Sequence, residues 1–293
     1  MADFGKVMTA MITPFNKDFD IDWKSADIIM DYLIENETDS FLIAGTTGES
    51  PTLSDKEKIE LFKFAKKKLK NNIPLIAGTG SNDTRHTIEL SRAAQEAGAD
   101  CVLIVTPYYN KPTQNGLINH YRQISESIDI PIIFYNVPAR TCCNITSSTS
   151  LKLSEFKNIL GVKEASGDLR QIAEIIRDCS SDFLVYSGND GDTFPVVALG
   201  GKGVVSVASH IIGKEIKKMI NLLNENKISE AAEMHKKYLD IFYGIFITTS
   251  PIPIKKALNL MGIPAGYLRP PLCDMEKQEE EKFTKLLSDH KLI

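Results

Sequence analysis

Short apolar runs alternate with longer amphipathic stretches along most of this chain. The runs are rich in Val, Ile and Phe, which is typical of strands, and the stretches between them repeat apolar residues at helical spacing. Ser54-Asp55-Lys56-Glu57 has the form of a capping box at the start of one such helix. The predicted strands are 7–13, 40–44, 74–77, 101–105, 130–135, 159–163, 183–187 and 203–207. The predicted helices lie near 22–36, 54–70, 83–97, 114–128, 148–157, 168–178, 190–199 and 210–224.

The predicted strands are continuous apolar runs, as expected for a parallel sheet that is covered on both faces. Eight strand–helix units in a row favour a closed (β/α)8 barrel, a TIM barrel, over residues 1–224. The alternative is an open doubly wound sheet. Against it, the first strand runs into Ile12-Thr13-Pro14-Phe15, where a dinucleotide-binding fold would have a glycine-rich loop.

Beyond residue 224 the strand pattern stops. Three further helices are predicted at 228–244, 253–261 and 275–287, separated by turns that contain proline or glycine. No linker is long enough to make this part independent. We therefore predict a small C-terminal helical appendage, residues 225–293, on an α/β barrel.

Composition excludes several classes of protein. Of the 293 residues, 43% are hydrophobic and 25% charged, with a net charge of −4 and no basic block, which argues against a nucleic-acid partner. No signal-peptide pattern opens the chain, and no apolar run approaches the roughly 20 residues of a membrane helix. Five cysteines without a CxxC pair predict a reduced, cytoplasmic protein, and five scattered histidines predict no metal site.

Lys163 is the most informative single residue. It ends the apolar run Ile159-Leu160-Gly161-Val162-Lys163, where loss of water would favour its neutral amine. A neutral lysine amine attacks carbonyl carbons and forms a Schiff base. The alternative is a lysine that only extends from a strand end to solvent.

The other strand ends carry groups that suit such chemistry, and a barrel enzyme gathers them on one rim. They include an anion-binding turn, two tyrosines that could relay protons, and an arginine that could bind a carboxylate. Each also has a plainer interpretation: a simple turn, packing residues and a surface ion pair. The segments are Gly45-Thr46-Thr47-Gly48-Glu49-Ser50, Thr106-Pro107-Tyr108-Tyr109-Asn110, Tyr135-Asn136-Val137-Pro138-Ala139-Arg140-Thr141, Ser187-Gly188-Asn189-Asp190 and Gly203-Val204-Val205-Ser206. Together they indicate a lysine-dependent aldolase that acts on a 2-oxo acid.

Three of these segments resemble the signatures of the dihydrodipicolinate synthase and N-acetylneuraminate lyase family. They are Gly45-Thr46-Thr47-Gly48-Glu49, Tyr135-Asn136-Val137-Pro138-x-Arg140-Thr141 and Gly161-x-Lys163-Glu164-Ala165. The resemblance covers essentially the whole chain and is closer to the synthase branch, which carries the arginine and the Pro-Tyr-Tyr-Asn segment at 107–110. It implies a barrel fold, no metal or organic cofactor, and a homotetramer built from two tight dimers.

The resemblance also implies the substrates and the residue roles. Pyruvate would form an imine with Lys163 and then condense with L-aspartate-β-semialdehyde to give 4-hydroxy-tetrahydrodipicolinate, in lysine and diaminopimelate biosynthesis. Thr46, Tyr135 and Tyr109 would relay protons, with Tyr109 reaching in from a neighbouring subunit. Thr46 and Thr47 would hold the carboxylate of pyruvate, and Arg140 that of the semialdehyde. Gly188 and Val205 would line the pyruvate site through their backbones.

Two features depart from the family pattern. Cys142-Cys143 follows Arg140-Thr141 where relatives have glycine, so a turn with positive φ would be strained there. The positions that bind feedback lysine in inhibited relatives correspond to Asp55, Lys58 and His86, beside Asn82 and Tyr108. Lys58 would repel a cationic ligand, so we predict weak or absent inhibition by lysine.

Two rival functions stay open. One is another pyruvate aldolase of the same family, a sialic acid or 2-keto-3-deoxy sugar acid lyase, for which Arg140 would have no second carboxylate to bind. The other is a barrel kept as a sensor or scaffold without catalysis, although the lysine, the tyrosines and the threonine pair are all present.

Overall fold

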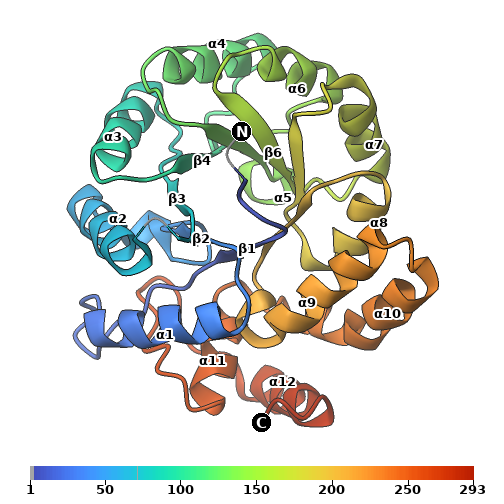
Figure 1. Cartoon of the computed structure of the whole chain (residues 1–293). Helices are drawn as coiled ribbons and strands as arrows, with labels where there is room; N and C mark the ends of the chain where they lie inside the picture. The colour runs from blue at the N-terminus through green and yellow to red at the C-terminus, as the bar shows by residue number, and fades with distance from the viewer. Residues whose placement is uncertain (1–2, 71) are drawn as a thin grey trace.

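The computed structural model describes residues 3–70 and 72–293 and shows a closed barrel of eight parallel strands (Figure 1). Each strand pairs with the next in sequence, and β8 closes on β1 with Val204 opposite Val7. This confirms the predicted (β/α)8 barrel. The strands are β1 (Val7–Ala10), β2 (Ser40–Ile43), β3 (Leu75–Gly78), β4 (Cys101–Val105), β5 (Ile132–Asn136), β6 (Ile159–Glu164), β7 (Leu184–Ser187) and β8 (Gly203–Ser206).

Helices form a ring around the barrel (Figure 1). Ser54 and Glu57 form the predicted capping box at the start of the second helix. The predicted helix at 190–199 begins instead as a 3-10 turn, η2 (Asp190–Asp192), and a short helix that was not predicted, α5 (Pro138–Thr141), follows β5. The ring helices are α1 (Trp23–Glu35), α2 (Asp55–Leu69), α3 (Thr84–Glu96), α4 (Gln114–Ser125), α6 (Ser147–Ser154), α7 (Leu169–Asp178), α8 (Thr193–Ala198) and α9 (Ser209–Asn224).

Two apolar layers explain why the strands read as continuous apolar runs. One layer fills the space between the strands and the helices, and the other fills the barrel interior. Alternate strand residues face opposite layers, and both layers exclude water. The interior layer contains Met8, Leu42, Ile76, Cys101, Leu103, Ile133, Tyr135, Ala165, Tyr186 and Val205, among others.

The first strand is shorter than predicted. It ends at Ala10, although the apolar run continues to Thr13. The backbone N–H of Ile12 donates to Nε2 of His210 at 3.2 Å, which replaces the strand pairing expected there. A sequence pattern carries no trace of a partner that lies 198 residues away.

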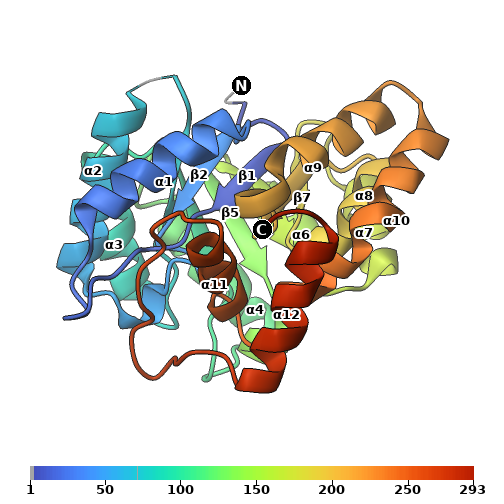
Figure 2. The ribbon, with the colours of Figure 1, turned by 90° about the horizontal axis from the view of Figure 1, so that it is seen from below.

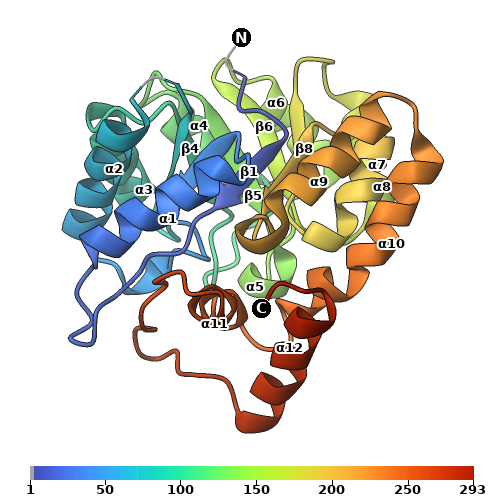
Figure 3. The ribbon, with the colours of Figure 1, turned by 60° about the horizontal axis from the view of Figure 1, so that its bottom comes forward.

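The C-terminal helices are α10 (Ile228–Gly244), α11 (Ile252–Leu260) and α12 (Lys277–Asp289). Helices α10 and α11 pack on α9, and α12 packs on α10 and α11. Helices α11 and α12 lie outside the helix ring (Figures 1 and 2), toward the end of the barrel where α5 also lies (Figure 3). Ile241, Ile254 and Phe283 join the outer apolar layer. The three helices therefore pack on the helix ring and on one another. Within the described part of the chain, no helix has the length and apolar character needed to cross a membrane.

Candidate active site

Lys163 lies on the inner side of the barrel near the end of β6. It stands opposite Tyr135 of β5 in the strand register, which places the two side chains next to each other. Its Nζ atom lies 4.1 Å from the centre of the Tyr135 ring, and the residue is only 5% exposed. The predicted lysine is thus a buried amine beside a phenol, and the alternative of a solvent-directed strand end is wrong.

Burial dominates the electrostatics of this amine. It lowers the pKa of Lys163 from 10.5 to about 7, because an ammonium loses its hydration there. The nearby carboxylate of Asp190 opposes this shift, and the positive charge of Arg140 adds to it. A large fraction of Lys163 is therefore neutral, and nucleophilic, near pH 7.

Asp190 lies beside Lys163, although no role was predicted for it from the sequence. Its carboxylate is buried and accepts from the hydroxyl of Ser206 and from the N–H groups of Val207 at 3.0 Å and Ala208 at 3.2 Å. Burial raises the pKa of Asp190, whereas these donors and Lys163 lower it. The only signal in the sequence was an acidic residue soon after an apolar strand.

Tyr135 is buried with its ring against Lys163. Burial raises the pKa of Tyr135 to about 12, with the charge of Arg140 acting in the opposite direction. The phenol therefore stays protonated at neutral pH and can donate a proton to a group bound at Lys163.

The loop after β2 presents unused hydrogen-bond donors. It is closed by a bond from the N–H of Gly48 to the carbonyl of Gly45 at 3.1 Å, and the hydroxyl of Thr13 donates to the carbonyl of Gly48 at 2.7 Å. Among residues 3–70 and 72–293, the backbone N–H groups of Thr46 and Thr47 donate to no protein group. Two adjacent free amides and two hydroxyls suit a carboxylate.

Arg140 lies in the short helix α5, and hydrogen bonds fix the turn that follows this helix. The hydroxyl of Thr141 donates to the carbonyls of Val137 at 3.1 Å and Cys143 at 2.9 Å. Cys142 ends the helix with φ of +54°, so the left-handed turn expected from the family pattern is present with cysteine in place of glycine. The departure therefore changes the residue and leaves the turn in place.

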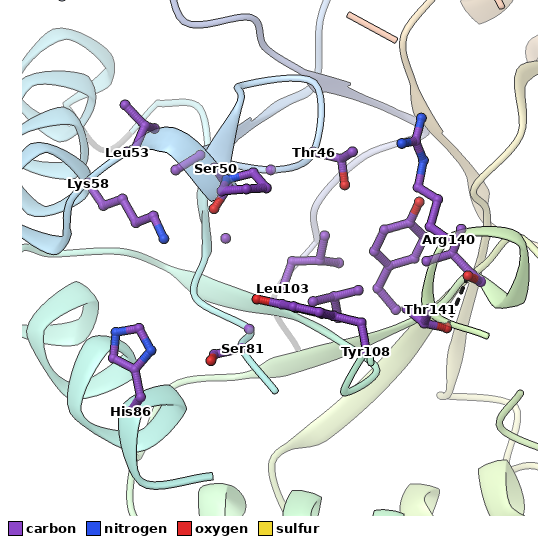
Figure 4. A pocket seen from close by; sticks show the side chains of 18 of the residues that line it. Thr46, Ser50, Leu53, Lys58, Ser81, His86, Leu103, Tyr108, Arg140 and Thr141 are labelled. Atoms are coloured by element: carbon purple, nitrogen blue, oxygen red, sulfur yellow. Dashed lines mark hydrogen bonds between the residues drawn. The ribbon is translucent and has the colours of Figure 1, made fainter. Parts of the chain in front are cut away.

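One cavity of about 520 Å³ opens beside these groups, with Tyr135 between the cavity and the amine of Lys163. Thr46, Tyr135 and Arg140 line one part of it. Figure 4 shows Lys58 and His86 at the opposite side of the cavity from Arg140.

The part of the cavity around Lys58 is also lined by Asp55, His86 and Tyr108, which were predicted from the family resemblance to correspond to lysine-binding positions. Nε2 of His86 lies 2.8 Å from the carboxylate of Asp55. Lys58 is buried, and burial lowers its pKa, with Asp55 opposing the shift.

The structure gathers most of the predicted site residues and leaves one outside. Gly188 lies against Lys163, because a Cβ atom at position 188 would stand 3.2 Å from Cε of the lysine. Thr47 is buried beside Thr46, and Val205 belongs to the interior layer with Tyr135. Tyr109 is 90% exposed, has φ of +73° and does not line the cavity. Within the described ranges, no group of three His, Cys, Asp or Glu side chains could hold a metal ion.

A buried amine, a phenol and a loop with free backbone amides lie at the carboxyl ends of the strands, which is where barrel enzymes carry their active sites. Residues 3–290 match the model of the dihydrodipicolinate synthetase family. The chain belongs to this family, and it is a pyruvate-dependent lyase.

Individual relatives agree over nearly their full length. A 4-hydroxy-tetrahydrodipicolinate synthase from Bacillus velezensis is 46% identical over 285 residues, which are 97% of this chain and 99% of the relative. A synthase of the same name from Bacillus subtilis is 44% identical, over 98% of this chain and 99% of the relative. The crystal structure of a dihydrodipicolinate synthase from Cyanidioschyzon merolae with lysine bound has a TM-score of 0.97, 43% identity and 99% coverage of both chains.

Proposed function

We propose that this protein condenses pyruvate with L-aspartate-β-semialdehyde through a Schiff base on Lys163, giving 4-hydroxy-tetrahydrodipicolinate. The observation that carries the proposal is the buried Lys163 amine, whose pKa is lowered to about 7, packed on Tyr135. The shared name and full-length similarity of the relatives support the same reaction.

The proposed mechanism begins with pyruvate held by Thr46 and Thr47. The neutral amine of Lys163 attacks the keto carbon, and loss of water leaves an imine, with Tyr135, Thr46 and Tyr109 carrying protons. The imine then loses a methyl proton to become an enamine, which attacks the aldehyde carbon of the second substrate. The amine of that substrate displaces Lys163 as the ring closes, which regenerates the free lysine. The imine on Lys163 acts as the electron sink, so the proposed mechanism uses no cofactor.

Arg140 is proposed to bind the carboxylate of the semialdehyde. It lines the cavity and its charge acts on both Lys163 and Tyr135, which supports a position beside the reacting carbon. We expect Arg140→Ala to lower kcat/KM for the semialdehyde on the order of a hundredfold, since a guanidinium–carboxylate bond is lost. Borohydride trapping of the pyruvate imine should change much less. An equal loss in both measurements would contradict this role.

Tyr109 is proposed to act in the site of a neighbouring subunit of a homotetramer. Its ring is almost fully exposed, which supports a contact outside its own chain. Mixed oligomers of Tyr109→Phe and Lys163→Ala chains should regain activity, because a site that has Lys163 from one chain and Tyr109 from the other is complete. Full activity of protein that sediments as a monomer would refute the proposal that Tyr109 acts in a neighbouring subunit.

Feedback inhibition by lysine is proposed to be weak or absent. Lys58 stands in the cavity where a cationic ligand would sit, and His86 rather than a carboxylate pairs with Asp55. Strong suppression of turnover by millimolar L-lysine would contradict this. If repulsion is the cause, Lys58→Ala should increase whatever inhibition lysine produces.

A panel of aldehydes tests the reaction itself. We expect the purified protein to consume pyruvate with L-aspartate-β-semialdehyde and not with N-acetylmannosamine or glyceraldehyde. Consumption with a sugar aldehyde instead would keep the Lys163 chemistry and move the enzyme to the lyase branch. A cytoplasmic location is also proposed, on the five free cysteines of the chain.

A further inference from the structure

A buried ion pair joins the C-terminal region to the Thr46–Thr47 loop. Nζ of Lys255 in α11 lies 2.5 Å from Oε1 of Glu49, and the two side chains are 2% and 1% exposed. Glu49 follows the threonine pair after one intervening residue, Gly48, and has φ of +56°. Its backbone N–H donates to the carbonyl of Thr46 at 3.1 Å. The position of Glu49 therefore bears directly on the position of Thr46.

Further contacts cross the same interface, whereas the ion pair with Lys255 is the contact of Oε1 of Glu49. The second carboxylate oxygen of Glu49 accepts the N–H of Arg269 at 2.9 Å. Lys255 donates to the carbonyl of Tyr267 at 2.6 Å, and its Nζ lies 4.5 Å from the ring centre of Phe15. These bonds connect α11 and the chain after it with the loops that follow β1 and β2.

Stability alone is a weak reason for this arrangement. Removing two charges from water costs free energy, and well-packed apolar side chains often stabilise a core as well as a buried ion pair does. The ion pair instead fixes the position of the loop relative to α11, since hydrogen-bonded charges restrict a geometry more narrowly than apolar contacts do. Burial lowers the pKa of Lys255 to about 8, with Glu49 opposing, so the amine is still largely charged at neutral pH.

We propose that Lys255 and Glu49 are positioning residues that hold the free amides of Thr46 and Thr47 in place for the carboxylate of pyruvate. The C-terminal region thereby fixes the position of a substrate-binding loop, although it does not contact the substrate itself. This inference rests on the proposed binding of pyruvate by the threonine pair. It assigns a function to α11 that neither the barrel nor the Schiff-base chemistry explains.

The test is Lys255→Met, with Lys256→Met as the matched control. Lys256 is the next residue of α11, and it pairs with Glu280 of α12 rather than with the loop. The readout is the pyruvate concentration that gives half-maximal labelling of the protein by borohydride, measured by mass spectrometry, together with KM for each substrate. We expect Lys255→Met to raise the pyruvate values about tenfold, with KM for the semialdehyde within twofold of wild type. Lys256→Met should match wild type throughout.

A second variant distinguishes a local effect on the loop from unfolding of the protein. Lys255→Met leaves Glu49 buried without its partner, so the double variant Glu49→Gln, Lys255→Met removes both charges and should fold. Its pyruvate values should also rise about tenfold, because the directed bond is absent. Values within twofold of wild type in the folded variants would overturn the inference. Failure of the wild-type protein to be labelled would instead refute the proposed function.

Discussion

The pH dependence of imine formation is the sharpest prediction from this site. Lys163 is buried beside Tyr135, and its pKa is lowered to about 7. The nucleophile is the neutral amine, which exists above the pKa of the group. The rate of imine formation should therefore rise with pH and level off above about pH 8.

The magnitude follows from the lowered pKa. A fall from 10.5 to about 7 corresponds to roughly 5 kcal/mol of selective destabilisation of the ammonium form. At pH 7 about half of Lys163 is neutral, compared with about 0.03% of a lysine that keeps its ordinary pKa. The lowered pKa, whose largest cause is burial, thus increases the concentration of the reactive form about a thousandfold.

Two substitutions should move the midpoint in opposite directions. Asp190→Asn removes the carboxylate that favours the charged amine, so the pKa of Lys163 should fall. The Asn oxygen can still accept from the N–H groups of Val207 and Ala208, while the hydroxyl of Ser206 turns to accept from the new amide. Arg140→Ala removes a positive charge, so the pKa should rise, by less in high salt because Arg140 is exposed.

The assay is the rate of borohydride-trapped imine with pyruvate alone, from pH 5.5 to 9.5. Leaving out the semialdehyde removes the second role of Arg140 from the measurement. A wild-type midpoint above pH 9 would refute the claim that burial activates Lys163. Midpoints of the two variants that move in the same direction would refute the assigned charges.

Two glycine-related predictions test the site by simpler changes. Cys142 has φ of +54°, a conformation that a β-branched residue adopts poorly and glycine adopts easily. In urea titrations, Cys142→Val should therefore lower the free energy of unfolding by about 1–2 kcal/mol. Cys142→Gly should leave it unchanged or raise it by up to about 1 kcal/mol. Gly188→Ala would place a Cβ atom 2.7 Å from that of Ala165 and 3.2 Å from Cε of Lys163, so kcat should fall on the order of a hundredfold. Gly191→Ala in the same loop meets only ordinary contacts and should keep activity; an equal loss there would assign the effect to the loop.

The barrel itself could be predicted because each of its signals is local. Continuous apolar strands, amphipathic helices and a capping box are written within a few residues of one another. The ends of the strands and helices were harder to predict. For example, β1 ends at Ala10, and the N–H of Ile12 donates to His210 and not to a neighbouring strand. The division of the chain at residue 224 stays a prediction, as do the roles assigned to individual site residues.

The parts of the site that escaped prediction depend on distant partners. Asp190 and Lys163 reach each other only because β6 and β7 are neighbours in a closed sheet. Arg269 and Glu49 are 220 residues apart and meet only because α11 and the chain after it pack on the loops beyond β1 and β2. Lys163 could be predicted from a single apolar run that ends in a lysine, and the family motif agreed with it. A buried charge pair has no such signature, since either member read alone is an ordinary surface residue until the fold removes it from water. The C-terminal region was therefore predicted as an appendage, and its contact with the Thr46–Thr47 loop emerged only from the fold.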